Sequence, residues 1–170
     1  NSILQPIISP WYESLENPQK AQEHILCDLL KKYAITDYGN SHNALQIART
    51  ADYQKSFPII DYKGLIPYLT QAREGNYKAI LPEPPECWVM TRGSTGKAKV
   101  LPATQTHLKQ IFTCGARAII NYALRKNNFE VFTGEILNLN FPSSVHTMTM
   151  DGREVSYGYS SGTYAKLNPM

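Results

Sequence analysis

The spacing of apolar residues changes at a proline-rich connector formed by Pro82, Pro84 and Pro85. Before the connector, apolar residues recur every three or four positions, and this spacing predicts amphipathic helices. After it, short apolar runs bounded by turn residues predict strands. Helices that are followed by strands alternating with a further helix favour an α/β fold. We therefore expect a helical N-terminal layer over the beginning of a mixed sheet.

Two main helices are predicted before the connector. The first is expected to begin at Asn17-Pro18, because Asn is a favourable N-cap and Pro fits the first helical position, and the helical region is expected to end at Gly39. Asp61 is the expected N-cap of the second helix, which Pro67 should kink or split. Residues 1–16 contain two prolines and are expected to form an irregular lead-in.

Beyond the connector, strand patterns surround one long helix. The helix is expected to begin at Thr104 or Thr106. Its predicted inward face consists of Leu108, Ile111, Phe112, Ile119 and Tyr122. Strands are predicted at residues 87–91, 99–101, 129–133, 136–141 and 145–150, with a turn at Asp151-Gly152. The tail from Tyr157 to Tyr164 has a flexible composition. No repeat or linker interrupts the sequence, so residues 1–170 are expected to form a single domain.

Positive charge is concentrated in one part of the chain. No Asp or Glu occurs between Cys87 and Phe129, whereas this stretch contains Arg92, Lys97, Lys99, Lys109, Arg117, Arg125 and Lys126. Local positive potential attracts anions, from phosphates to nucleic acid. For the four basic residues of the long helix, a solvated helix face is the alternative interpretation. No RRM, KH or zinc-knuckle pattern accompanies the charge, so nucleic acid is not an expected partner.

Composition excludes several classes of protein. With 42% hydrophobic residues the chain is too apolar for a disordered tail, and its uncharged runs are too short for a membrane span. The three cysteines form no C-x-x-C pair and the four histidines lack metal-ligand spacing, so no metal site is expected. Cys27 and Cys114 are expected to be buried free thiols. These thiols, and the lack of a leader after Asn1, predict a cytoplasmic protein.

The segment between the first two predicted strands carries the clearest chemical signal. Its sequence is Thr91-Arg92-Gly93-Ser94-Thr95-Gly96-Lys97-Ala98-Lys99. The two glycines permit a tight turn and a close approach of the backbone to a ligand, and backbone N–H groups in such a turn form an anion-binding concavity. Hydroxyl donors and three cations in this segment suit a polyphosphate.

This segment is not a Walker A loop. Only two residues separate Gly93 from Gly96, and Ala98 stands where a Walker A loop has Ser or Thr. The segment does not fit the dinucleotide fingerprint G-x-G-x-x-G either. Spacing alone therefore leaves two interpretations open, a phosphate-binding loop and a hairpin without a ligand.

The nine-residue segment resembles the signature phosphate loop of the adenylate-forming superfamily, which includes acyl-CoA synthetases, adenylation domains and luciferases. Arg92 stands where a small residue is usual in that superfamily, and Ala98 where Pro is usual. The flanking sequence is similar to the Gretchen Hagen family of auxin-responsive acyl-acid amido synthetases and its microbial relatives. This similarity covers residues 15–108 well and residues 109–170 loosely. It rests on Leu15–Leu26, Thr36–Gly39, Phe57–Tyr62, Leu65–Leu69, Gly75 and Leu81–Leu108.

The resemblance implies the N-terminal part of a larger ATP-dependent ligase. In that superfamily the loop holds the β- and γ-phosphates of ATP while a carboxylate attacks the α-phosphate, and an amine or a CoA thiol then takes the acyl group. Hydroxyl and backbone N–H donors would come from Thr91, Gly93, Ser94, Thr95 and Gly96. Lys97, Lys99 and Arg92 would supply positive charge, and Mg²⁺ would bridge the phosphates.

The resemblance leaves the catalytic residues, the acid and the acceptor unnamed. The expected partners are a small carboxylic acid and an amine or CoA acceptor, without nucleic acid or membrane, and a homodimer through an open face of the chain. A nucleotide-binding or structural module that keeps the fold and lacks catalysis is the alternative. By itself the chain is expected to be inactive, because it would supply only the polyphosphate side of an adenylation site.

Overall fold

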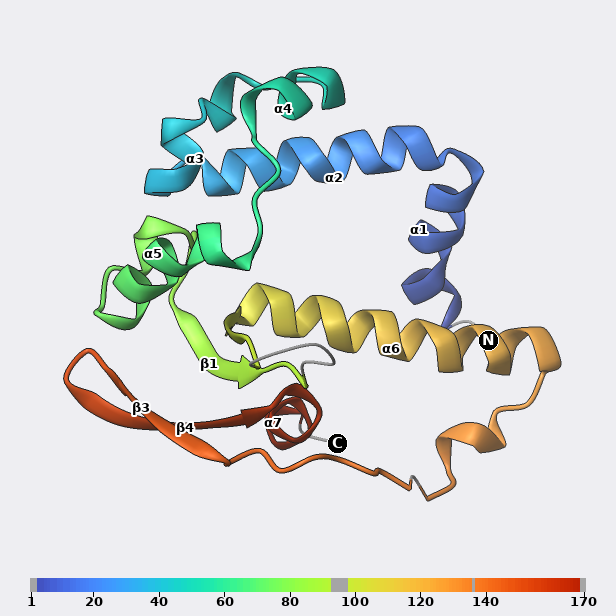
Figure 1. Cartoon of the computed structure of the whole chain (residues 1–170). Coiled ribbons are helices and arrows are strands. Elements are labelled where there is room, and N and C mark those ends of the chain that lie inside the picture. Colours follow the sequence, from blue (N-terminus) through green and yellow to red (C-terminus); the bar gives the residue numbers. More distant parts are fainter. Residues whose placement is uncertain (1–2, 93–97, 136, 169–170) are drawn as a thin grey trace. The chain divides into compact units, whose positions relative to one another are not determined.

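The computed structural model describes residues 3–92, 98–135 and 137–168 (Figure 1). The chain divides into two compact units. The smaller unit combines Asn1–Gln22 with Thr106–Leu139, and the larger combines Glu23–Gln105 with Asn140–Met170. Each unit therefore brings together segments that are far apart in the sequence. Helices dominate the smaller unit, whereas the larger unit contains the sheet.

The smaller unit begins with a helix that the sequence did not predict. α1 spans Gln5–Glu16, so the expected irregular lead-in is wrong. Pro6 lies in the first turn of α1, where backbone N–H groups make no hydrogen bond within the helix, so the N–H that proline lacks is not needed. The second proline, Pro10, lies in the interior of the helix. Ile8 is completely buried, and burial of this kind stabilises a helix against a weak intrinsic propensity.

The long helix is confirmed, and only part of its predicted face is buried. α6 spans Gln105–Lys126, beginning directly after Thr104. Leu108 is buried and Phe112 is half-buried, but Ile111, Ile119 and Tyr122 keep 37%, 41% and 46% of their surface exposed. Near the end of α6 the buried residues are Ala123, which lies on the apolar side that the sequence pattern indicates, and Ile120, which the pattern did not include.

The covered side of α6 therefore turns along the helix, which has 22 residues and is about 33 Å long. Toward its C-terminal end, Asn121 accepts a hydrogen bond of 2.5 Å from the Tyr12 hydroxyl of α1. The prediction of one straight apolar face on this helix did not include that polar contact.

Two predicted strands after α6 are absent from the described residues. In place of the strand at 129–133, a short 3₁₀ helix, η3, spans Glu130–Phe132. The Asn128 side chain accepts a hydrogen bond from the backbone N–H of Glu130 and favours this local turn. The described residues between 137 and 141 form no strand, with Leu137 and Leu139 about 85% exposed. β-type residues alone do not make a strand where no neighbouring strand pairs with them.

After α1, further helices precede the first strand, and they belong to the larger unit apart from the first five residues of α2. They are α2 (Pro18–Tyr33), α3 (Asp37–Ser41), η1 (Ala44–Gln46), α4 (Thr50–Ser56), α5 (Tyr62–Arg73) and η2 (Tyr77–Ala79). The helical region that was expected to reach Gly39 breaks after Tyr33. Thr36 then caps α3 by accepting a hydrogen bond of 2.9 Å from the Gly39 N–H. A Cβ at Gly39 would lie 2.1 Å from the Tyr33 carbonyl oxygen, so this turn requires glycine.

The predicted start of α5 is confirmed. Asp61 is its N-cap, and the carboxylate accepts a hydrogen bond of 3.0 Å from the Gly64 N–H. Pro67 lies inside α5 without splitting it. Leu69 and Ala72 of this helix are buried together with Trp88 of the sheet, so α5 covers one face of the strands. Trp88 belongs to the core, since only 2% of its surface is exposed.

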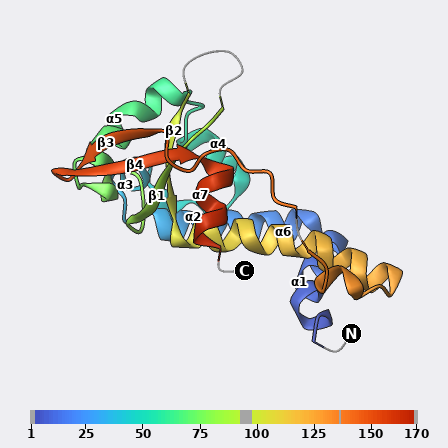
Figure 2. The same ribbon diagram turned by 90° about the horizontal axis from the view of Figure 1, so that it is seen from below.

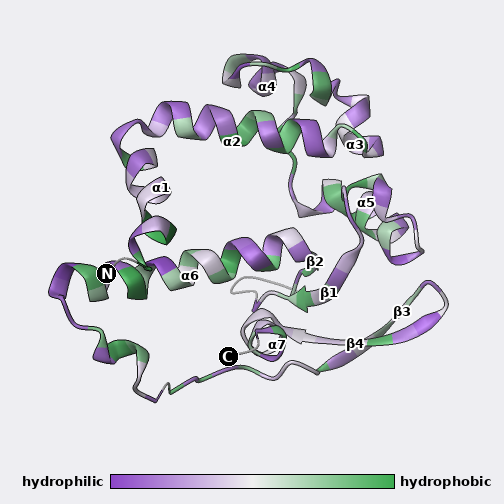
Figure 3. Ribbon diagram, turned by 180° about the vertical axis from the view of Figure 1, so that it is seen from behind, coloured by the Kyte–Doolittle hydropathy of each residue, from purple (hydrophilic) through white to green (hydrophobic). Residues whose placement is uncertain are grey.

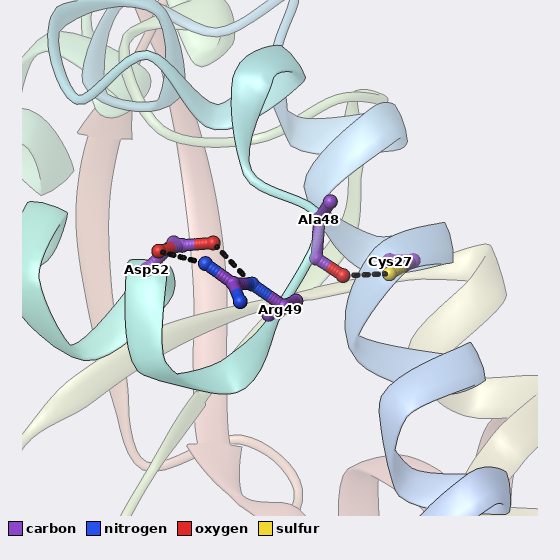
Figure 4. A network of polar contacts seen from close by, with 4 residues as sticks. All are labelled: Cys27, Ala48, Arg49 and Asp52. Carbon is purple, nitrogen blue, oxygen red and sulfur yellow. Dashed lines mark hydrogen bonds and ion pairs between the residues drawn. The ribbon is translucent and has the colours of Figure 1, made fainter.

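A second apolar cluster holds α2 against the segment around α4. Leu30, Ala44 and Ile47 form its buried centre. Beside it, the Cys27 thiol donates a hydrogen bond to the Ala48 carbonyl, and Arg49 pairs with Asp52 at the start of α4 (Figure 4). All three cysteines are free, as predicted. Cys27 is half-buried, and Cys114 is exposed, so the expectation that Cys114 is buried is wrong.

The sheet is mixed and has four strands in the order β2-β1-β4-β3 among the described residues (Figure 2). The strands are β1 (Pro85–Met90), β2 (Val100–Thr104), β3 (His146–Met150) and β4 (Arg153–Tyr159). β1 pairs antiparallel with β2, β3 pairs antiparallel with β4, and β1 runs parallel to β4. The predicted α/β class and mixed sheet are confirmed.

The tail that looked flexible in composition is ordered. Asp151 and Gly152 form the predicted turn between β3 and β4, both with positive φ. β4 then leads directly into α7, which spans Ser160–Leu167. The parallel register pairs Met90 with Tyr159, so β1 and β4 end side by side. This end of β1 is hydrophobic (Figure 3), with Val89 and Met90 buried.

Candidate functional site

A closed pair of hydrogen bonds forms the base of the candidate loop. The Thr91 N–H donates to the Lys99 carbonyl at 2.8 Å, and the Lys99 N–H donates to the Thr91 hydroxyl at 3.1 Å. These bonds continue the antiparallel pairing of β1 with β2 by one step. The prediction that the 91–99 loop joins two short strands is confirmed by the positions of β1 and β2. Ligands of open α/β sheets bind beyond the carboxyl ends of parallel strands, and this loop follows that end of β1.

Three of the eight predicted binding residues lie within the described structure. Thr91, Arg92 and Lys99 stand together at the base of the loop, with Arg92 and Lys99 exposed. The other five predicted residues lie outside the described residues; they are Gly93, Ser94, Thr95, Gly96 and Lys97. The structure thus describes the two cations that flank the predicted turn.

Arg92 lies against an aromatic ring from a distant part of the chain. Its guanidinium carbon is over the ring of Phe141, 4.4 Å from the ring centre. That distance is well inside the range of a cation–π interaction. Phe141 lies in the irregular segment before β3 and keeps 43% of its surface exposed. The sequence pattern placed Phe141 in a strand and carried no signal for this contact.

Lys99, which follows the loop, also lies near an aromatic ring. Its ammonium nitrogen lies 5.6 Å from the ring centre of Tyr62, the first residue of α5. The Tyr62 hydroxyl accepts a hydrogen bond of 3.2 Å from the Val100 N–H and also lies 3.3 Å from the Val100 carbonyl oxygen, to which it donates. Tyr62 therefore fixes the first residue of β2 and contacts the lysine that precedes it.

The segment that carries Phe141 is held against the junction of β4 and α7. The Phe141 N–H donates to the Ser161 hydroxyl at 3.2 Å, and the Tyr159 N–H donates to the Pro142 carbonyl at 2.9 Å. The Phe141 and Tyr159 rings are 5.2 Å apart. Glycine at position 162 allows the backbones to approach, because a Cβ there would lie 2.0 Å from the Phe141 carbonyl oxygen.

Within the described part of the chain, no carboxylate forms an ion pair with Arg92 or Lys99 at the base of the loop. Among the residues that the structure describes, ion pairs join His24 to Asp28 and Arg49 to Asp52. Neither pair includes Arg92 or Lys99. Positive charge that is exposed and uncompensated attracts anions. The described ranges also contain no group of three or more metal-ligating side chains, and none of their helices is long and apolar enough to cross a bilayer.

The half-buried thiol of Cys87 on β1 is expected to be unreactive. Burial raises the pKa of Cys87 to about 11, and the neighbouring Glu86 carboxylate adds to the rise. At pH 8 only about 0.1% of this thiol is therefore thiolate, the reactive form. We expect iodoacetamide at pH 8 to modify the exposed Cys114 at least tenfold faster than Cys87, as measured by peptide mass spectrometry. Equal rates in the folded protein would contradict this expectation.

The helices, the mixed sheet and the strand–loop–strand unit define an α/β domain whose candidate site lies beyond the end of β1. Residues 8–169 match the GH3 family N-terminal domain, and the chain belongs to this family, the Gretchen Hagen 3 acyl-acid amido synthetases. Enzymes of the family are adenylating ligases that use ATP and act on an acid and an amine. No curated protein and no solved structure matches the chain.

Proposed function

We propose that the segment from Thr91 to Lys99 binds the β- and γ-phosphates of ATP in a ligase that activates a carboxylic acid. The observation that carries this proposal is the hairpin base formed by Thr91 and Lys99, with the exposed cations Arg92 and Lys99 beside it. Membership in a family of ATP-dependent adenylating ligases supports the same role. Gly93 and Gly96 would allow the backbone between them to turn around a phosphate.

The proposed reaction has two steps. A carboxylate oxygen of the acid attacks the α-phosphorus of ATP, the bond from that phosphorus to the bridging oxygen breaks, and pyrophosphate leaves. An amine then attacks the acyl carbon of the adenylate, so that an amide forms and AMP leaves. The family favours an amine as acceptor, and a CoA thiol is the less favoured choice.

Each proposed binding residue acts on the leaving pyrophosphate. Hydroxyl groups of Thr91, Ser94 and Thr95 would donate hydrogen bonds to phosphate oxygens, together with backbone N–H groups of the turn. Lys97, Lys99 and Arg92 would offset the charge that develops on pyrophosphate as it leaves, and this effect lowers the barrier. Mg²⁺, held through the phosphates, supplies further charge neutralisation when it is bound.

The binding role can be tested by calorimetry with inorganic pyrophosphate and with ATP, each in the presence of Mg²⁺. Replacing Lys97 by alanine should weaken pyrophosphate binding about tenfold, since one charge-assisted contact contributes roughly 1.4 kcal/mol. Lys55→Ala removes one exposed lysine from the last turn of α4 and is the matched control. Equal losses in the two variants would contradict a specific role for the loop.

A further inference from the structure

We propose that Phe141 and Tyr62 are positioning residues that hold the two cations beside the loop in place for phosphate. The inference rests on the proposed function of residues 91–99 and extends it to two residues outside that segment. Phe141 precedes β3 and Tyr62 begins α5, so two separate parts of the larger unit each contribute a ring. Neither ring is expected to touch the acid or ATP directly.

The choice of an aromatic ring in place of a carboxylate has a physical consequence. A carboxylate beside Arg92 would fix its side chain and also cancel its charge. A ring attracts the guanidinium through its quadrupole, carries no net charge, and leaves the positive potential available to an anion. At an exposed site the attraction is weak, so the ring limits the rotamers of Arg92 without preventing a phosphate contact. Less conformational entropy is then lost when phosphate binds.

Phe141 suits this role because its own position is well determined. Its N–H donates to Ser161, its ring packs beside Tyr159, and its carbonyl oxygen lies against Gly162. Tyr159 pairs with Met90 at the end of β1, immediately before Thr91 and Arg92. The ring and the arginine that it contacts are therefore anchored to adjacent strands of one sheet, and they keep their relative placement.

Tyr62 suits the same role at Lys99. Its hydroxyl bonds to both polar backbone atoms of Val100, so the ring is tied to the residue next to the lysine. Asp61 caps α5 directly before Tyr62 and fixes the start of that helix. The Tyr62 ring is thus fixed both by Val100 and by the start of α5. The flexible side chain of Lys99 therefore has a preferred position near this ring.

The test is a double-mutant cycle on the full-length protein, with Mg²⁺ and inorganic pyrophosphate as the probe. Phe141→Leu removes the ring, Phe141→Tyr retains it, and Arg92→Met removes the charge. We expect Phe141→Leu to weaken pyrophosphate binding about threefold, and Phe141→Tyr to restore the wild-type affinity. In the Arg92→Met background, Phe141→Leu should have no further effect, because the cation it positions is gone.

The corresponding cycle at the second ring uses Tyr62→Leu, Tyr62→Phe and Lys99→Met. Tyr62→Phe loses the hydrogen bonds to Val100 but keeps the ring, so it should bind pyrophosphate more tightly than Tyr62→Leu. In the Lys99→Met background, the two Tyr62 variants should bind equally. The control is Phe132→Leu in η3, which removes another exposed ring and should leave affinity unchanged.

The outcomes separate this inference from the function on which it rests. An undiminished effect of Phe141→Leu in the Arg92→Met background would overturn it, because the ring would then act on structure alone. Tighter binding by Phe141→Leu would overturn it as well, since the ring would be withholding the arginine. Absence of pyrophosphate binding by the wild type would instead refute the proposed function. Phe141→Met serves as the second ring-deleting variant if Phe141→Leu does not fold.

Discussion

Replacing Gly162 by alanine is expected to destabilise the protein by more than about 3 kcal/mol, although the substitution lies inside helix α7. Alanine in a helix interior is normally favoured over glycine by roughly 1 kcal/mol. Here the new Cβ would lie 2.0 Å from the Phe141 carbonyl oxygen and 2.9 Å from the Ser143 nitrogen. Both are backbone atoms, so the 141–143 segment would have to move away from the end of the sheet.

The chain contains a matched control for this substitution. Gly115 lies in the interior of α6, and a Cβ there would meet nothing within 4 Å. Gly115→Ala is therefore expected to stabilise the protein by about 0.5–1 kcal/mol. The measurement is urea unfolding followed by far-UV circular dichroism. Stabilisation by both substitutions would contradict the close backbone contact at Gly162.

Exchange of labelled pyrophosphate into ATP is expected from the full-length protein when it is given its acid and Mg²⁺, because adenylation is reversible. Gly96→Val should reduce this exchange by at least about 100-fold, which corresponds to roughly 2.7 kcal/mol of transition-state stabilisation. A branched side chain at this position would obstruct both the turn and the approach of the phosphate. The assay is a panel of aryl, indole and fatty acids with both proteins at equal concentration.

The 170-residue chain alone is expected to show no exchange. Adenylation requires the carboxylate, the α-phosphate and Mg²⁺ to be held in line, and we propose that this chain supplies only the polyphosphate side of such a site. Robust exchange by the 170 residues would contradict this view. Failure of the full-length protein to exchange with any acid would favour a non-catalytic, nucleotide-binding module. Lys55→Ala, distant from the loop in sequence, should exchange like the wild type.

The sequence alone determined the features that depend on a few neighbouring residues. Asp61 caps α5 through the N–H three residues later, and Asp151-Gly152 makes the turn between β3 and β4. The strand–loop–strand unit around residues 91–99 was also predicted from the sequence, because turn residues lie between two short apolar runs. Such features involve local hydrogen bonds and local φ preferences, so the residue types carry the information.

Other features were decided only by the tertiary structure. The apolar run at 129–133 became a 3₁₀ turn, and α1 formed in spite of two prolines. Whether a run becomes a strand depends on the presence of a partner, and whether a weak helix persists depends on what it buries. Neither condition can be evaluated within a window of neighbouring residues.

The residues of the candidate site also include some that the sequence predicted and others that only the tertiary structure revealed. Its eight residues were named from sequence, because the motif is contiguous, and three of them are described at the base of the loop. Phe141 and Tyr62 were not named, although they lie against Arg92 and Lys99. They come from positions 49 and 37 residues away along the chain. Only the parallel pairing of β1 with β4 and the packing of α5 on the sheet bring these rings to the loop, since a cation–π contact has no sequence spacing of its own.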